Sequence, residues 1–337
     1  MEKKNNKKKN YGISLLRIIL SFMVVIDHFY DNKKAKKYVN ILYYHIPTFF
    51  VISFYYTNKT LVSFDRNKIK FRFKRLVFPY FCWTFISFCL NNIYFYLCKR
   101  ICPHKVYDLL NGLLNGMVFI VSLWFQNILI FTTLLLTIFI WLFKNDYLLI
   151  FQIFMILSYI IQYSGENYKF FKNHFNNFYA ANYGRFIDTF PNSLTGFFIA
   201  SMKINNKIKY CKLRTIFICI FFLLIVTNYN FDSSLKSFRY GGLRLNIASC
   251  CIFFVFFFSF EKVKNLLIIK IIDILSIYSA GIYFIHIIIG KGYIIKLLLV
   301  NKINTIFGCF NIYIISYMFC FLIDKIFGNT NLKHLIK

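Results

Sequence analysis

The sequence predicts an all-α, polytopic integral membrane protein with about ten transmembrane helices, and three observations favour this fold class. Apolar residues make up 58% of the 337 positions and aromatic residues 22%. Charged residues make up only 16%, whereas soluble domains carry about 25% charge and roughly 45–50% apolar residues. Apolar runs of about 20 residues, enough to cross a bilayer, recur along the chain. A soluble core could not enclose them all.

The first apolar run follows a Lys-rich tail, as a secretory signal does, but no small-residue cleavage site comes after it and it contains Arg17. We therefore expect an uncleaved first helix. Residues 106–122 are also apolar but contain Gly112 and Gly116, so this segment either spans the membrane or lies on it. The ten predicted spans are residues 11–30, 41–58, 77–97, 123–143, 147–163, 187–202, 214–230, 243–260, 272–290 and 303–323.

No internal repeat or domain linker interrupts these spans. The predicted organisation is a basic tail over residues 1–10, a membrane domain over 11–325 and a short C-terminal tail over 326–337. The ten cysteines lie mostly inside apolar runs and form no zinc-ligand pattern, so no metal site is expected.

The net charge of +29 raises the question of nucleic acid, but the basic residues lie mainly in loops between apolar runs. The positive-inside rule and attraction to anionic membrane lipids explain that distribution, so no nucleic-acid partner is expected. With the N-terminus in the cytoplasm, the inside segments hold 24 Lys and Arg residues and the outside loops 16. This bias predicts that both termini are cytoplasmic and that the protein resides in the cell (inner or plasma) membrane.

Charged side chains inside a span are costly and need a partner, a cavity or a function. Arg17 and His28 are 11 residues apart in the first span. They therefore share one helix face and lie about 16 Å apart along the axis. In one interpretation Arg17 snorkels to the headgroups and His28 is an interfacial residue. In the other, a cation and a proton acceptor face a common polar channel.

Other polar residues in or near spans also admit two interpretations. His45, which opens the second span, is either a solvated loop-edge residue or part of a site near His28. Tyr283 and His286 lie in the ninth span, where a lone histidine is usually a helix–helix hydrogen-bond partner. Arg185 precedes the short sixth span, whose Pro191 suggests a broken helix that lines a cavity.

A basic cluster lies before the third span and contains Arg72, Lys74 and Arg75. It is either a membrane anchor or a clamp for a phosphorylated ligand, because arginine binds phosphate through paired hydrogen bonds.

Five segments in order along the chain together resemble the membrane acyltransferase-3 family. They are the opening helix over 15–29, the Pro-x-Phe-Phe-x-x-Ser motif at 47–53, the Arg-Leu-x-x-Pro-Tyr motif at 75–80, Leu-Trp-Phe at 123–125 and Gly-x-Tyr-x-x-His at 281–286. Phe54 occupies a position where the family motif has glycine, and this departure removes a close-packing point.

The resemblance implies O-acetylation or a related O-acylation. The donor would be cytoplasmic acyl-CoA, usually acetyl-CoA, used as a substrate with no permanently bound cofactor, and the acceptor a hydroxyl of a cell-surface or exported glycan or lipid-linked saccharide. It implies that His28 activates the acceptor or assists acyl transfer, and that Arg17 holds the donor or orients the channel. It further implies that the basic cluster meets the CoA phosphates. His45, Tyr283, His286 and Arg185 are further candidates. The alternative is a non-catalytic glycan transporter or flippase of similar architecture.

Overall fold

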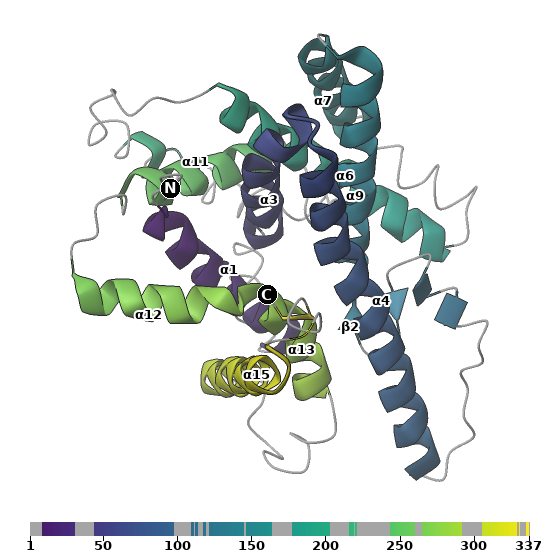
Figure 1. Ribbon diagram of the computed structural model, residues 1–337, viewed down its shortest axis with the longest axis vertical. Helices are drawn as coiled ribbons and strands as arrows, with labels where there is room; N and C mark the ends of the chain where they lie inside the picture. The colour runs from purple at the N-terminus through teal and green to yellow at the C-terminus, as the bar shows by residue number, and fades with distance from the viewer. Residues whose placement is uncertain are drawn as a thin grey trace, which may run out of the picture.

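The structure is a computed structural model, and the residues that it describes are helical almost throughout (Figure 1). Its helices are α1 (Tyr11–Phe29), α3 (His45–Val62), α4 (Arg66–Leu97), α6 (Trp124–Phe143), α7 (Tyr147–Tyr163), α9 (Asn177–Ser201), α11 (Leu243–Ser259), α12 (Leu266–Ile277), α13 (Ser279–Lys291) and α15 (Ile306–Phe327). The short strands β1 (Met117–Val118) and β2 (Val121–Ser122) form an antiparallel pair. The structure describes residues 9–30, 44–97, 109–110, 112–113, 117–118, 121–144, 146–163, 177–202, 216–218, 220, 243–259, 265–291, 305–328, 330 and 335–336.

The predicted all-α fold is confirmed, and several predicted spans coincide with helices. Those at 11–30, 123–143, 147–163 and 243–260 match α1, α6, α7 and α11 to within a residue at either end. The helices α4 and α9 begin well before their predicted starts. The predicted span 272–290 is divided between α12 and α13, which meet at a bend of 55°. The predicted span 214–230 and the segment 106–122 fall largely outside the described residues.

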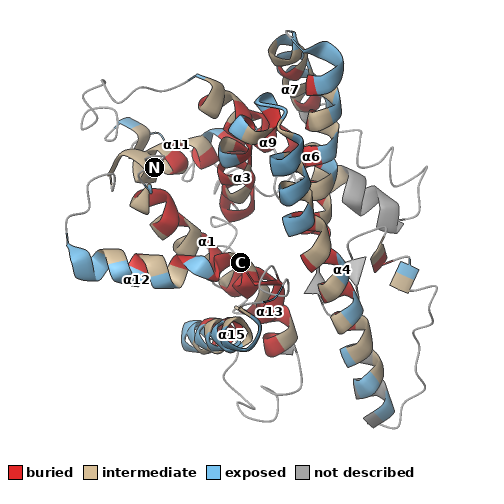
Figure 2. Ribbon diagram, viewed as in Figure 1, coloured by how far each residue is buried: buried red, intermediate tan, exposed pale blue. Residues whose placement is uncertain are grey.

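In the part of the chain that the structure describes, four helices, α1, α4, α6 and α15, are long and apolar enough to cross a membrane, and the bent pair α12–α13 makes a fifth if it is taken as one span. The outer faces of α6, α12 and α15 present large apolar side chains, with Leu266 74% and Phe307 70% exposed (Figure 2). Apolar patches of this extent are unfavourable in water and are expected where a protein faces lipid. The chain is therefore a membrane protein.

The interior is built around α3, which packs most extensively against α9 and also contacts α1, α11, α6 and α4. The α3 and α9 backbones approach closely at Gly196, where a Cβ would overlap the carbonyl oxygen of Val51. Phe54 is fully buried in the same core. The close approach of α3 and α9 therefore depends on a glycine of α9 that faces the α3 backbone at Val51.

The sixth predicted span is a continuous helix, so the expectation of a broken helix at Pro191 is wrong. α9 runs through the proline from Asn177 to Ser201. The Thr195 hydroxyl donates to the Pro191 carbonyl at 2.8 Å, and the Thr189 hydroxyl donates to the Arg185 carbonyl at 2.7 Å. Packing against α3 and α7 holds the helix together although the proline removes one backbone donor.

Candidate functional site

Polar side chains gather at both ends of α1, which runs antiparallel to α3. At one end, the Asp27 carboxylate lies 4.0 Å from Nε2 of His45, the first residue of α3. Toward the other end, Arg17 interacts electrostatically with Tyr56 of α3 and Arg75 of α4. We call the second region the basic end (Arg17, Lys68, Arg72 and Arg75) and the first the histidine end (Asp27, His28, His45 and His286).

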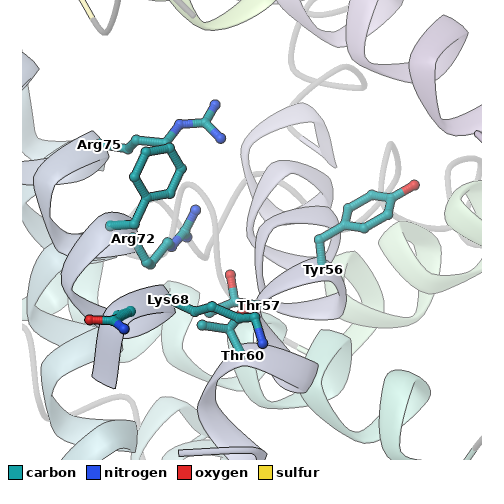
Figure 3. A pocket seen from close by; sticks show the side chains of 8 residues that line it. Tyr56, Thr57, Thr60, Lys68, Arg72 and Arg75 are labelled. Atoms are coloured by element: carbon teal, nitrogen blue, oxygen red, sulfur yellow. The ribbon is translucent and has the colours of Figure 1, made fainter. Parts of the chain in front are cut away.

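The basic end contains a pocket of about 420 Å³ between α3 and α4 (Figure 3). Four of the five α4 residues that line it, at positions 68, 71, 72 and 75, follow the spacing i, i+3, i+4 and i+7, so they share one helix face. In this described part of the chain the lining contains three cations and no carboxylate. The lining residues are Tyr56, Thr57 and Thr60 from α3 and Asn67, Lys68, Phe71, Arg72 and Arg75 from α4.

Arg72 is the most constrained cation of the pocket. Its Nη2 donates to the Ser53 hydroxyl of α3 at 2.7 Å. Its Nε is buried and has no hydrogen-bond partner among the described residues. Arg75 is more exposed and lies with its guanidinium carbon 5.9 Å from the centre of the Phe71 ring. The pocket therefore combines a fixed guanidinium with a more accessible one.

Lys74, predicted to act with the two arginines, is exposed and is not among the lining residues. Two residues along a helix correspond to a rotation of about 200°, so Lys74 and Arg72 point to opposite sides of α4. Lys68, one turn before Arg72, lines the pocket instead. The helical period applied backward from Arg72 would have identified it.

Lys68 forms an ion pair with Asp65, the residue that precedes α4. The Asp65 carboxylate accepts backbone hydrogen bonds from Asn67 at 3.1 Å and Lys68 at 3.2 Å, as an N-capping side chain does. The Lys68 ammonium lies 2.6 Å from the same carboxylate, and its hydrogen bond holds the pKa of Asp65 below the usual range. The pocket therefore draws its positive charge from the two arginines and from a lysine that is paired with Asp65.

The histidine end brings His28 of α1 and His286 of α13 together, with ring centres 5.2 Å apart and planes inclined by 39°. His286 is fully buried, and its Nδ1 lies 2.8 Å from the Ile282 carbonyl oxygen. The Tyr283 ring packs near both His286 and Phe125, at centre-to-centre distances of 6.0 Å and 5.0 Å. Three predicted site residues, His28, Tyr283 and His286, thus meet in one place.

His45 is fully buried, so its interpretation as a solvated loop-edge residue is wrong. Its neighbour is the carboxylate of Asp27. Helix geometry turns Asp27 about 100° away from His28. The histidine end therefore contains two adjacent pairs, Asp27 with His45 and His28 with His286, and the sequence identified neither pairing.

Ser21 lies on α1 between the two ends, on the helix face shared by Arg17 and His28. Its hydroxyl is 3.3 Å from the Tyr313 hydroxyl of α15 and donates to the Ile18 carbonyl at 2.8 Å. A polar position is therefore maintained midway along a helix that is otherwise strongly apolar.

Arg185 lies outside the basic pocket. Its guanidinium carbon is 4.8 Å from the centre of the Trp124 ring, a cation–π contact. Asn58 of α3 hydrogen-bonds to Ser201 at the end of α9, so α3 and α9 run parallel and Arg185 lies toward the histidine end.

The acyltransferase-3 family model, an acyltransferase domain, matches residues 10–325, which include both ends of α1. The chain belongs to the acyltransferase-3 family. The family resemblance noted from the five sequence segments is thereby confirmed. No curated protein and no solved structure matches the chain. Membership in this family supports acyltransferase chemistry in general, and the donor and acceptor have to be argued from the site.

Among the described residues, no group of three His, Cys, Asp or Glu side chains is placed to hold a metal ion. The described cysteines are free thiols at Cys82, Cys89, Cys250, Cys251, Cys309 and Cys320. The chemical groups at the two ends of α1 are guanidinium, ammonium, hydroxyl and amide at the basic end, and imidazole and carboxylate at the histidine end.

Proposed function

We propose that this acyltransferase-3 family member is a membrane O-acyltransferase. It transfers an acyl group, most simply acetyl, from cytoplasmic acyl-CoA to a hydroxyl of a cell-surface or exported glycan or lipid-linked saccharide. The observation that carries the proposal is that the two ends of α1 have different chemical groups beside them. One end borders a pocket lined by cations, and the other end carries a histidine pair.

The pocket suits the phosphate groups of a CoA thioester. Arginine binds phosphate through paired, charge-assisted hydrogen bonds, and the hydroxyl of Thr60 adds a neutral donor. The unsatisfied Nε of Arg72 provides a donor that a phosphate oxygen can accept from. Arg17 adds a positive charge nearby, which favours the same anionic ligand.

The histidine end suits the acceptor. A neutral His28 imidazole removes the proton from the attacking hydroxyl as its oxygen bonds to the thioester carbonyl carbon. The carbon–sulfur bond then breaks, and the protonated His28 returns the proton to the departing CoA thiolate. The products are the O-acyl ester and CoA, with atoms and charge balanced. Because the two ends are about 16 Å apart along α1, the pantetheine arm must extend along this helix to present the carbonyl.

The test compares surface glycan from cells that lack the gene with glycan from cells that express wild type, His28→Ala or His28→Gln. Mass spectrometry should find an added acyl unit in wild type alone, with all three proteins equally abundant in the membrane. A general base contributes about 10²–10⁴-fold, and glutamine can hydrogen-bond but cannot accept a proton at neutral pH. An active His28→Gln variant would rule out the base. Wild-type glycan without an acyl group would instead favour the transporter.

A further inference from the structure

The hydrogen bonding of His286 defines its tautomer. Its Nδ1 lies 2.8 Å from the Ile282 carbonyl, one helical turn earlier, and a carbonyl can only accept, so Nδ1 carries the hydrogen. The ring is fully buried, where an unpaired charge is costly. The neutral ring therefore has its lone pair on Nε2. This nitrogen is buried without a hydrogen-bond partner among the described residues.

His28 is the polar side chain that faces this ring. The rings of Phe29 and Tyr283 are farther away, with centres 6.1 Å and 6.0 Å from the centre of the His286 ring. The charged or titratable groups that act electrostatically on His286 are His28 and Asp27. Two imidazoles with centres 5.2 Å apart have room for one N–H···N hydrogen bond and for no side chain between them.

The packing of α13 fixes this arrangement. At Gly290, a Cβ would overlap the ring of Phe29, the residue after His28, so glycine lets α13 press against the end of α1. At the other end of α13, Tyr278 marks the bend from α12 and donates its hydroxyl hydrogen to Asp324 of α15 at 2.7 Å. The helix that carries His286 is thereby held on both sides.

We propose that His286 is a positioning residue for His28. Its Nε2 has no hydrogen-bond partner among the described residues, and a small rotation of the nearby His28 ring would let it accept a hydrogen bond from one His28 ring nitrogen. That bond would leave the other His28 ring nitrogen unprotonated and directed at the acceptor hydroxyl. When His28 takes up the hydroxyl proton, the same bond stabilises the imidazolium. A third group that orients a catalytic base is usual, and here a neutral imidazole serves in place of a carboxylate. The inference rests on the proposed function in that His28 is taken as the base.

The kinetic test uses three substitutions of His286 in the full-length protein. His286→Gln keeps an acceptor near the Nε2 position, His286→Asn withdraws it by one carbon, and His286→Phe keeps ring volume without an acceptor. We expect Asn and Phe to lower kcat about 10–100-fold, the usual cost of losing an orienting partner. We expect KM for acyl-CoA to stay unchanged and Gln to retain most activity. Wild-type kcat in His286→Phe, or loss with Gln equal to that with Phe, would overturn the proposal.

A second measurement does not depend on activity. Nitrogen NMR of ¹⁵N-histidine-labelled protein in lipid nanodiscs reports which ring nitrogen carries hydrogen, and His28→Gln and His286→Gln samples assign the two signals. His286 should be protonated on Nδ1 only, and the His28 signals should shift in His286→Phe. A hydrogen on Nε2 of neutral His286, or unmoved His28 signals, would reject the pairing. An inactive wild type would refute the proposed function and leave this readout intact.

Discussion

Replacing Arg75 by alanine tests whether the basic pocket binds the donor, and Lys74→Ala is its matched control. Both substitutions remove one positive charge at adjacent positions on α4, but only Arg75 lines the pocket. Arg72 is less suitable because its hydrogen bond to Ser53 also joins α3 to α4. A difference in KM for acyl-CoA between the two alanine variants would therefore arise from where the lost charge lies and not from the loss of one charge as such.

A hydrogen bond to a charged group contributes about 1.5–3 kcal/mol, and each 1.4 kcal/mol is about tenfold in affinity. Arg75→Ala should therefore raise KM for acyl-CoA roughly 10–100-fold. The kcat should hardly change, because a phosphate contact is the same in ground state and transition state. Lys74 is exposed and lies outside the pocket, where a charge with no ligand contact contributes at most about 1 kcal/mol, so Lys74→Ala should change KM less than about fivefold.

The assay is acyl transfer at varied acyl-CoA concentration by purified protein in lipid nanodiscs. An acyl-pantetheine thioester, which lacks the nucleotide phosphates, serves as the second donor. Wild type and Arg75→Ala should use this donor equally well, because the contact removed is to a phosphate. Equal defects in Arg75→Ala and Lys74→Ala would refute the reasoning, since the charges would then act through their long-range field. A persistent defect with acyl-pantetheine would place Arg75 elsewhere on the reaction path.

Two further predictions concern packing and topology. Gly196→Ala should destabilise the protein by about 1–3 kcal/mol, because the added Cβ would overlap the α3 backbone. Gly184→Ala, on the same helix, adds a Cβ that meets no atom within 4 Å, so it should be neutral or stabilising by up to about 1 kcal/mol. Thermal unfolding in detergent measures both variants, and equal shifts in melting temperature would contradict the close contact at Gly196. In a cysteine-free background, single cysteines at Lys8, Phe64 and Lys333 should all resist a membrane-impermeant thiol reagent in intact cells, because we expect these positions in the cytoplasm; external labelling at any of them would show that the span count is wrong.

The helices that the sequence located best are those whose apolar runs coincide with the whole helix. α1 also begins directly after its N-cap residue, because the Asn10 side chain accepts a hydrogen bond from the backbone N–H of Ile13 at 3.1 Å. Hydropathy placed the starts of α4 and α9 too late, because their first turns contain basic or polar residues that helix formation tolerates. The local rule that proline breaks a helix fails at Pro191, because tertiary packing, which such a rule cannot include, keeps α9 continuous.

The candidate site likewise contains features that follow from one segment of sequence and features that depend on tertiary packing. The shared face of Arg17 and His28 follows from helical periodicity within one segment and needed no tertiary information. The pairing of His28 with His286 joins residues far apart in the chain and depends on the bend at Tyr278 and the close approach at Gly290. The pairing of Asp27 with His45 depends on how α3 returns along α1. These contacts arise from tertiary packing, for which a single sequence contains no signal.

The separation of Arg17 from His28 fixes the distance between the cations that would bind the donor's phosphates and the base that would act on its acyl group. The donor's phosphates need cations in a polar setting, and its thioester carbonyl must meet a base that is shielded from water. A rigid helix satisfies both, because 11 residues give about 16 Å of rise and return the side chain to within roughly 20° of the starting face. Ten or twelve residues would turn His28 about 80–120° off that face, away from His286 and from the line of the pantetheine arm. On the proposed function, the spacing in the opening helix would therefore set both the reach of the donor and the direction of the base.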